Sequence, residues 1–365
     1  MRPVPEYRDV DRRRFEGEIV PAGRPAVLRG LCAGWPAARQ EGEEALAAYL
    51  RSAASDEPFE AWFGPPEIGG RFGYAPGFTG FNHDRRLATV DQLLDLLLRQ
   101  RGHGAPFSIY AGAIPVPRHL PALLPEIPMP LLDPGREKLV SLWLGNRTRT
   151  AAHWDLPQNL ACVVAGRRRF TLFPTEQVRN LYVGPLDFTL AGQPTSLVDL
   201  EAPDFDRHPR FREALEAAET AELGPGDALY LPSLWWHAVA SLDELGAMVN
   251  FWWRDGEPPL LTPLNALYHA AITVKDLPPG GAGGVAGAVR LLHLPGSWRS
   301  GRAPARVGAR DSGPAHARAG GAGQSDAGSG AGALADSTPS LRAKRSNPER
   351  PRTQHWIASS LRSSQ

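Results

Sequence analysis

Lysine and cysteine are scarce in this chain of 365 residues. Lys138, Lys275 and Lys344 are the only lysines, whereas 37 residues are arginines. The two cysteines, Cys32 and Cys162, form no Cys-x-x-Cys pair and cannot supply a disulfide framework. The sequence therefore excludes a small secreted fold that is held together by disulfides.

Long apolar runs are also missing. No stretch approaches the roughly 20 apolar residues that a membrane helix needs. The N-terminus, "MRPVPEYRDVDRRRFEG", has no apolar h-region, so we expect no secretion signal, no membrane association and a cytoplasmic protein. With 42% hydrophobic and 22% charged residues, the composition is that of a globular protein.

The formal net charge of +1 hides an asymmetry. Residues 280–365 contain 12 Arg or Lys and 4 Asp or Glu, a net charge of +8, whereas residues 1–279 carry 28 basic and 35 acidic residues, a net charge of −7. The tail is rich in Gly, Ala, Ser and Arg and has no periodic apolar pattern, so we predict that 280–365 is disordered. Its charge would suit contact with nucleic acid. A solvated tail without function is the simpler interpretation, and nucleic acid is not an expected partner otherwise.

Residues 1–105 read as strands and helices that pack on the domain that follows. We expect short helices over 41–52 and 88–100, and the second begins with a predicted capping box of Thr89 and Gln92. His83 and His103 fall in polar loops and are assigned no role.

In residues 106–256, short β-rich runs alternate with turn signals, which indicates a sandwich or barrel that is mainly β with flanking helices. One helix is expected to interrupt the strands, at 209–223. Residues 257–279 carry leucines at helical spacing and predict a helix. This helix could serve homodimerisation, although a plain core helix explains the same pattern.

The stretch "TRTAAHWDLPQN" places His153 and Asp155 two residues apart. In a strand, residues i and i+2 point to the same face, so the two side chains could share one metal ion. A third ligand would come from a distant strand, and His237 follows the predicted strand in "LGPGDALYLPSLWWHAV". A single histidine in an aromatic strand is usually a hydrogen-bonded core residue. The three residues together match the facial triad of non-haem Fe(II) oxygenases, which leaves three octahedral positions free for a bidentate 2-oxo acid and O₂.

Four motifs stand in order along the chain: "TAAHWDLPQN", "AGRRRFTLFP", "GPGDALYLPSLWWHAV" and "VNFWW". In this order and spacing the chain resembles the jumonji-C/cupin-like Fe(II)/2-oxoglutarate oxygenases, and among them the branch of the asparaginyl hydroxylase that inhibits hypoxia-inducible factor. The resemblance covers about residues 20–275. It implies a double-stranded β-helix, the cupin or jelly-roll barrel, with the catalytic barrel in residues 106–256.

The resemblance also implies roles for individual residues. His153, Asp155 and His237 would bind Fe(II). Six further residues would form the binding site for the co-substrate 2-oxoglutarate, namely Tyr110, Thr150, Asn159, Arg168, Asn250 and Trp252. Thr150 raises a difficulty, because strict alternation from His153 turns it to the opposite face unless a bulge or turn lies between them.

Arg168 stands where the family has a lysine that fixes the distal carboxylate of 2-oxoglutarate. Among three consecutive arginines, Arg168 alone shares parity with the apolar residues Phe170 and Leu172, so it should point inward. A buried cation is costly without a partner, and an inward arginine therefore predicts an anion opposite it. By the same alternation, Trp235 and Trp252 are the tryptophans expected to line the pocket.

The leading hypothesis is an oxygenase that uses Fe(II), 2-oxoglutarate and O₂, releases succinate and CO₂, and hydroxylates or demethylates a protein, a peptide or a small molecule. The loop at 174–209 is the expected site of substrate specificity. Two alternatives remain open: a cupin metalloenzyme that does not use 2-oxoglutarate, and a degenerate barrel that only binds a partner.

Overall fold

The computed structural model describes residues 1–255, 264–274 and 277–278. The chain divides into two units, Met1–Leu260 and Leu261–Gln365. In the second unit the described part contains helix α6, Leu264–Thr273, within the segment expected to be helical. The predicted disordered tail, 280–365, lies outside the described residues, and dimerisation through the 257–279 helix stays a prediction.

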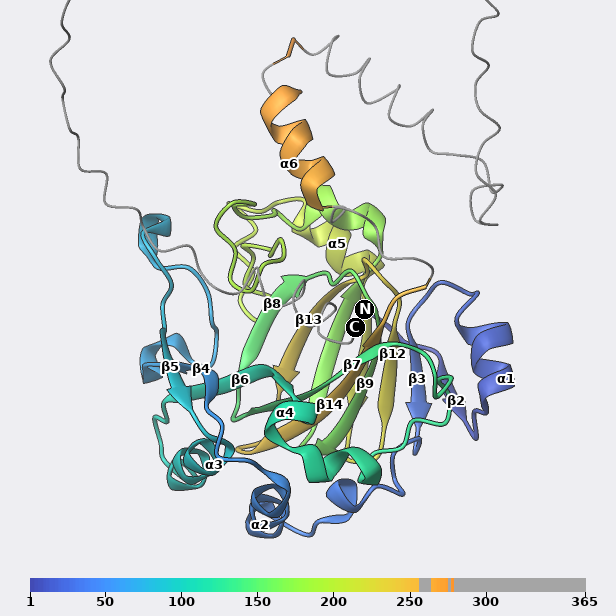
Figure 1. Cartoon of the computed structure of the whole chain (residues 1–365). Helices are drawn as coiled ribbons and strands as arrows, with labels where there is room; N and C mark the ends of the chain where they lie inside the picture. The colour runs from blue at the N-terminus through green and yellow to red at the C-terminus, as the bar shows by residue number, and fades with distance from the viewer. Residues whose placement is uncertain (256–263, 275–276, 279–365) are drawn as a thin grey trace, which may run out of the picture. The chain divides into compact units, whose positions relative to one another are not determined.

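Two β-sheets make up most of the first unit, which confirms the prediction of a mainly β fold (Figure 1). The nine-stranded sheet runs in the order β2 (Glu6–Arg8), β3 (Ala26–Arg29), β12 (Ala228–Leu231), β9 (Gln158–Ala165), β14 (Gly246–Trp253), β7 (Lys138–Gly145), β6 (Ser108–Pro115), β4 (Phe59–Gly64) and β5 (Asp84–Ala88). The five-stranded sheet runs in the order β1 (Arg2–Pro3), β11 (Glu219–Leu223), β10 (Arg168–Phe173), β13 (Trp236–Ser241) and β8 (Arg149–His153). Strands from residues 1–105 thus extend both edges of the larger sheet.

The large sheet has two differently lined faces because side chains alternate along each strand. In β9, Ala161 and Val163 belong to the apolar cluster that also contains Phe170 and Leu172 of the small sheet. The residues that alternate with them, Leu160, Cys162 and Val164, belong to the larger cluster on the other face. The first face therefore encloses the barrel interior between the two sheets.

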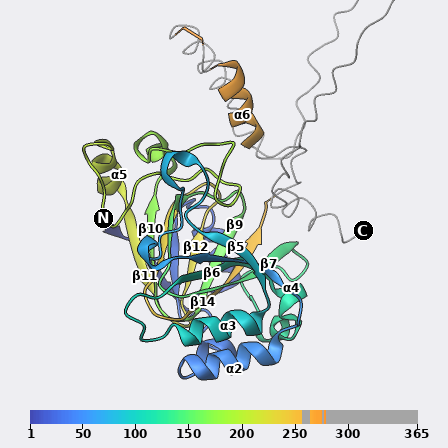
Figure 2. The same ribbon diagram turned by 90° about the vertical axis from the view of Figure 1, so that its left-hand side faces the viewer.

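Helices cover the other face of the large sheet (Figure 2). The main ones are α2 (Glu43–Ala53) and α3 (Val90–Arg99), and their buried leucines join strands β7, β9 and β14 in one core. The capping box predicted for α3 is present, with Thr89 as the N-cap and Gln92 reaching back to it. The remaining helical segments are short: α1 (Arg12–Arg14), η1 (Phe15–Ile19), η2 (Pro36–Arg39), η3 (Pro66–Ile68), η4 (Pro76–Phe78), α4 (Val116–His119), η5 (Pro121–Glu126), η6 (Thr175–Asn180) and α5 (Phe211–Ala217).

The helix predicted over 209–223 is wrong in its second half. Helix α5 ends at Ala217, and Glu219–Leu223 forms strand β11, which pairs antiparallel with β10. Alanine and glutamate favour a helix locally, but a free edge of β10 offers a full ladder of backbone hydrogen bonds. The tertiary pairing overrides the local preference.

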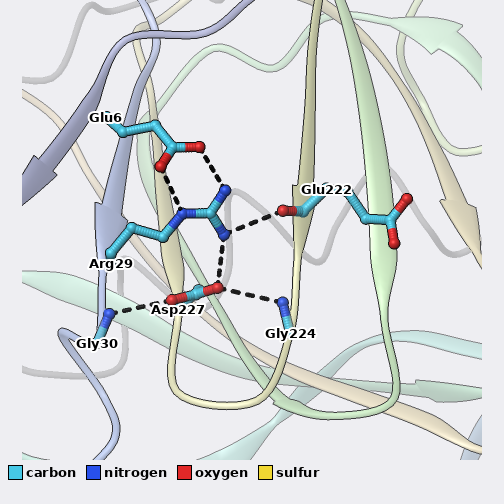
Figure 3. A network of polar contacts seen from close by, with 6 residues as sticks. All are labelled: Glu6, Arg29, Gly30, Glu222, Gly224 and Asp227. Carbon is cyan, nitrogen blue, oxygen red and sulfur yellow. Dashed lines mark hydrogen bonds and ion pairs between the residues drawn. The ribbon is translucent and has the colours of Figure 1, made fainter.

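A polar network fixes the turn that joins the two sheets (Figure 3). Asp227 ends the Gly-Pro-Gly-Asp turn between β11 and β12, and its carboxylate accepts the backbone N–H groups of Gly30 and Gly224 at 3.0 and 3.3 Å. Arg29 donates to Asp227 at 2.6 Å and pairs with Glu6 on the neighbouring strand. The network therefore connects β2, β3 and the turn that leads to β12.

Among the described residues, no helix is long and apolar enough to span a membrane.

Candidate metal centre

His153, Asp155 and His237 meet at one end of the small sheet. His153 is the last residue of β8, and the antiparallel pairing of β8 with β13 sets His237 directly opposite it. The two imidazole rings are 4.3 Å apart between centroids, and His237 Nε2 lies 3.5 Å from Asp155 Oδ2. One potential ligand atom from each residue lies within 4.8 Å of the others, and this is the only such group among the described residues.

Backbone carbonyls orient both histidines. The Nδ1 atom of His153 is 2.9 Å from the carbonyl oxygen of Ala151, and the Nδ1 atom of His237 is 3.0 Å from that of Trp235. If Nδ1 carries the proton, it donates to the carbonyl and leaves Nε2 as the acceptor that a metal requires. The same hydrogen bond fixes the rotation of each ring.

The protonation states suit a metal site. Burial lowers the pKa of His153 to about 4, so its imidazole is neutral near pH 7. Burial alone would raise the pKa of Asp155, but a hydrogen bond from His237 and the two neighbouring imidazoles outweigh this effect and lower it. Two imidazoles and one carboxylate are the donor set of a facial triad.

A cavity opens next to the three residues, in the barrel interior. Four buried polar atoms without a hydrogen-bond partner belong to its lining, namely Trp143 Nε1, Arg168 Nε, Asn250 Oδ1 and Trp252 Nε1. Buried polar groups are nearly always paired, so several orphaned groups around one cavity indicate the place of a polar ligand.

Arg168 is the strongest of these signals. Its side chain lines the cavity, and the residue is 3% exposed, as its parity with Phe170 predicts. No carboxylate pairs with it in the described chain, and its one hydrogen bond, to the carbonyl of Trp143, is 3.4 Å long. Burial lowers its pKa to about 10, which still leaves the guanidinium charged at neutral pH. A charged, unpaired cation inside the barrel requires an anion.

Thr150 reaches the same cavity because β8 contains the predicted irregularity. The register between β8 and β13 shifts, so that His237 opposes His153 but Val239 opposes Thr150. The extra residue in β8 turns Thr150 to the side of His153. Thr150 there hydrogen-bonds the hydroxyl of Tyr110, whose pKa is raised by burial.

The other predicted residues lie on β9 and β14. Asn159, Asn250 and Trp252 all line the cavity, and the Nδ2 group of Asn250 donates to Asn159 Oδ1 at 2.9 Å. Trp235 does not line it, contrary to the expectation from alternation. It precedes β13 rather than extending it, and its indole donates to the carbonyl of Gly23. The backbone bends there because Leu234 has a positive φ of 68°.

Trp143 was not identified from the sequence. It lies on β7 with its indole in the cavity, against Trp252 at 5.9 Å between ring centroids. A Cβ atom on Gly112 would be 2.8 Å from this indole, so the glycine is required for the close approach of β6. The sequence did contain a signal for Trp143: it alternates with the core residues Leu142 and Leu144 of β7, so its side chain points to the opposite face of the sheet.

The loop after β10 returns to the metal residues. Thr195 forms an isolated bridge with His153, and the backbone N–H of Ser196 donates to Ala152 O at 2.7 Å. Two residues before Thr195, the Oε1 atom of Gln193 is buried without a partner. The sequence indicated the loop, but it could not indicate that Thr195 and Ser196 lie next to the metal strand β8.

Comparison with known proteins identifies the family of this chain. The family described as "Cupin-like domain" matches residues 12–257. The chain is 27% identical over 258 residues to Lysine-specific demethylase 8 of Xenopus tropicalis, which covers 68% of this chain and 52% of that protein. It is 27% identical over 273 residues to Lysine-specific demethylase JMJ31 of Arabidopsis thaliana, covering 66% and 48%.

A shorter match, 33% identical over 102 residues, is to tRNA wybutosine-synthesizing protein 5 of Mus musculus and covers 28% of this chain and 29% of that protein. The chain thus spans about half the length of the two demethylases. These matches confirm the resemblance to the jumonji-C/cupin-like proteins that the four motifs predicted.

Proposed function

This chain belongs to the cupin-like domain family, and from that premise we propose that it is an Fe(II)- and 2-oxoglutarate-dependent oxygenase. The observation that carries the proposal is the triad of His153, Asp155 and His237 beside a cavity that holds the unpaired cation of Arg168. The reaction would hydroxylate a C–H bond of a protein, a peptide or a small molecule. Demethylation would follow where that bond belongs to an N-methyl group.

In this account each residue has one task. The imidazoles of His153 and His237 and the carboxylate of Asp155 would hold Fe(II). When bound, the metal with 2-oxoglutarate and O₂ supplies the oxidising chemistry. Arg168 would bind the distal carboxylate of 2-oxoglutarate, and the hydroxyl groups of Thr150 and Tyr110 would hydrogen-bond the same carboxylate.

The barrel limits access of water to this chemistry. Apolar side chains close the cavity, including Phe170, Leu231 and Met248. In such surroundings an ion pair with Arg168 is stronger than it would be in water. The same surroundings make it costly to leave Arg168 unpaired, which favours binding of the dicarboxylate before the substrate.

The substrate would approach past the loop at 174–209. We propose that the amide oxygen of Gln193 accepts a hydrogen bond from it, because this atom is buried without a partner and Thr195, two residues later in the same loop, bridges to His153. The names of the relatives point to different substrates: lysine in a protein for two of them, and tRNA for the third. For this chain a protein or peptide has the wider support, since the demethylases match about two thirds of its length.

Formation of succinate tests this function. With Fe(II), 2-oxoglutarate and O₂, the wild-type protein should release succinate slowly even without substrate, and His153→Ala should release none. Arg167→Met provides the matched control, because Arg167 is exposed and pairs with Asp243 outside the cavity. Absence of both succinate formation and 2-oxoglutarate binding in the wild type would contradict the proposal.

Arg168 favours one second candidate, a cupin metalloenzyme that does not use 2-oxoglutarate. A guanidinium is larger than the ammonium of the family lysine and could be matched to a different acid. Metal binding by the triad together with binding of another carboxylic acid, but not 2-oxoglutarate, would support this candidate.

A further inference from the structure

A second cavity lies on the outer face of the small sheet, on the other side of strands β8 and β13. Its lining includes the small residues Thr171, Ala238 and Ala240. These residues alternate with Phe170, Leu172 and His237, which face the barrel interior. The two cavities are thus separated by one sheet, and Thr150 and Val239 contribute to both linings.

Three arginines line this outer cavity: Arg71, Arg149 and Arg169. Backbone carbonyls hold two of them in place. Arg71 Nη2 donates to Leu197 O at 3.1 Å, and Arg149 Nη2 donates to Gly69 O at 3.2 Å. Both side chains are about two thirds buried, with 35% and 30% exposed. The guanidinium groups are therefore positioned in advance, so a ligand would not have to order them.

The carboxylates in the cavity do not satisfy this charge. Asp199 lies between Arg71 Nε and Arg149 Nη1, at 3.6 Å from each, and makes no hydrogen bond with either. A charge-assisted hydrogen bond between guanidinium and carboxylate is about 2.7–2.9 Å long. One oxygen of Asp199 accepts the backbone N–H of Glu201 instead. By contrast, Arg169 Nη2 donates a hydrogen bond to Glu201 Oε1 at 2.8 Å, so this arginine has a carboxylate partner.

We propose that this outer cavity binds a phosphate group, either as inorganic phosphate or as a phosphomonoester. Its oxygens would bridge Arg71 and Arg149, each guanidinium donating through its free N–H groups, while Asp199 moves aside. Two loosely paired guanidiniums match the two negative charges of a phosphate dianion better than the single charge of Asp199 does. The site is separate from the metal centre, and the inference does not depend on the oxygenase activity.

Titration calorimetry of the full chain without added metal or 2-oxoglutarate tests the inference, with inorganic phosphate in one arm and phenyl phosphate in the other. Binding of both probes identifies the group itself as the ligand, and binding of phenyl phosphate alone identifies a phosphomonoester. Arg71→Gln and Arg149→Gln should each weaken binding about tenfold or more, because each removes a charge-assisted hydrogen bond. Asp199→Asn should strengthen it, because it removes the competing carboxylate.

Two controls keep the result specific. Arg86→Gln should leave binding unchanged, because Arg86 pairs with Asp84 at the exposed edge strand β5. Arg168→Gln should also leave it unchanged, and a loss of binding there would place the phosphate in the metal cavity and overturn the inference. The inference is equally wrong if neither probe binds the wild type at about 10 mM, or if Asp199→Asn weakens binding. The Asp199→Asn arm remains decisive even if an arginine variant fails to fold.

Discussion

Under the proposed function, Arg168 would decide which acid the barrel holds. A lysine at its position would be a shorter point charge, whereas the guanidinium offers two parallel donors to one carboxylate. Its burial without a counterion costs free energy that a bound carboxylate would recover.

We predict that Arg168→Met abolishes measurable 2-oxoglutarate binding, a loss of at least 30-fold. Removing one partner of a buried charge pair costs about 2–5 kcal/mol. Arg168→Lys should restore part of the affinity, since it supplies the charge without the second donor. Calorimetry with the Fe(II)-loaded protein under anaerobic conditions measures this, with Arg167→Met as the control. Unchanged affinity in Arg168→Met would mean that another group binds the co-substrate.

His83 makes stability depend on pH. It lies in a loop, as predicted, but its ring is partly buried there, stacked on Trp62 at 4.7 Å and on Phe81 at 5.5 Å between ring centroids. Burial and the nearby charge of Arg85 lower the pKa of His83 to about 4. The native state therefore keeps this imidazole neutral in a range where the unfolded chain, with an ordinary pKa of about 6.5, binds a proton.

The free energy of unfolding should consequently fall as the pH decreases from about 6.5 to 4, by up to about 1.4 kcal/mol per pH unit from this residue. His83→Phe keeps an aromatic ring and removes the titration, so it should flatten the profile in that window. Urea unfolding at several pH values measures the slope. The exposed His103 offers the control, and an equal change in His103→Phe would contradict the assignment to His83.

At the scale of the elements, the turn before β12 depends on Arg29. This side chain joins strands β2 and β3 to the carboxylate of Asp227, which closes the turn (Figure 3). A hydrogen bond from Arg29 lowers the pKa of Glu6. The contribution of Glu6 to stability is therefore present at neutral pH and is lost as the pH falls through this lowered pKa.

We predict that Arg29→Met lowers the free energy of unfolding by about 2–3 kcal/mol, because it leaves Asp227 half-buried without its main charged partner. The exposed pair of Arg86 and Asp84 gives the comparison, and Arg86→Met should change stability by less than about 0.5 kcal/mol. Equal effects in the two variants would show that the network is no more stabilising than a surface ion pair.

Elements with strong local signals were predictable from the sequence. The capping box at Thr89 fixes the start of α3, and the alternation in β10 identifies Arg168 as the inward arginine. From the sequence, Thr150 could share a face with His153 only if a bulge or turn lay between them. The register of β8 against β13 shows that such a bulge exists and where it lies. Strand β11 could not be predicted, because its conformation depends on a partner strand about 50 residues earlier in the chain.

At the scale of the whole molecule, the site combines strands that are distant in sequence. His153 and His237 meet because β8 and β13 are neighbours, and Arg168 lies on β10, which pairs with β13 on its other side. Residues on the loop at 174–209, such as Thr195, could not be predicted, because no periodicity links them to strand β8, which they contact. The residue types and spacing of the triad were enough to predict a metal site. The roles of Trp143 and of the outer arginine cavity became visible only in the fold.

All predicted site residues lie before residue 256. Deletion of 280–365 should therefore leave the affinities for Fe(II) and 2-oxoglutarate unchanged within about twofold, while it removes a net charge of +8. Calorimetry of the full chain and the shortened chain measures both. A large loss of either affinity would mean that residues 280–365 contribute to binding of Fe(II) or of 2-oxoglutarate.

Anaerobic titration of the protein with Fe(II) and 2-oxoglutarate shows whether the triad and the cavity hold the metal and the 2-oxo acid together. A 2-oxo acid that chelates iron gives a visible metal-to-ligand charge-transfer band. We predict this band in the wild type and in Arg167→Met, and its absence in His153→Ala. A folded wild-type protein that binds Fe(II) but never develops the band would contradict the assignment of this barrel as a 2-oxoglutarate oxygenase.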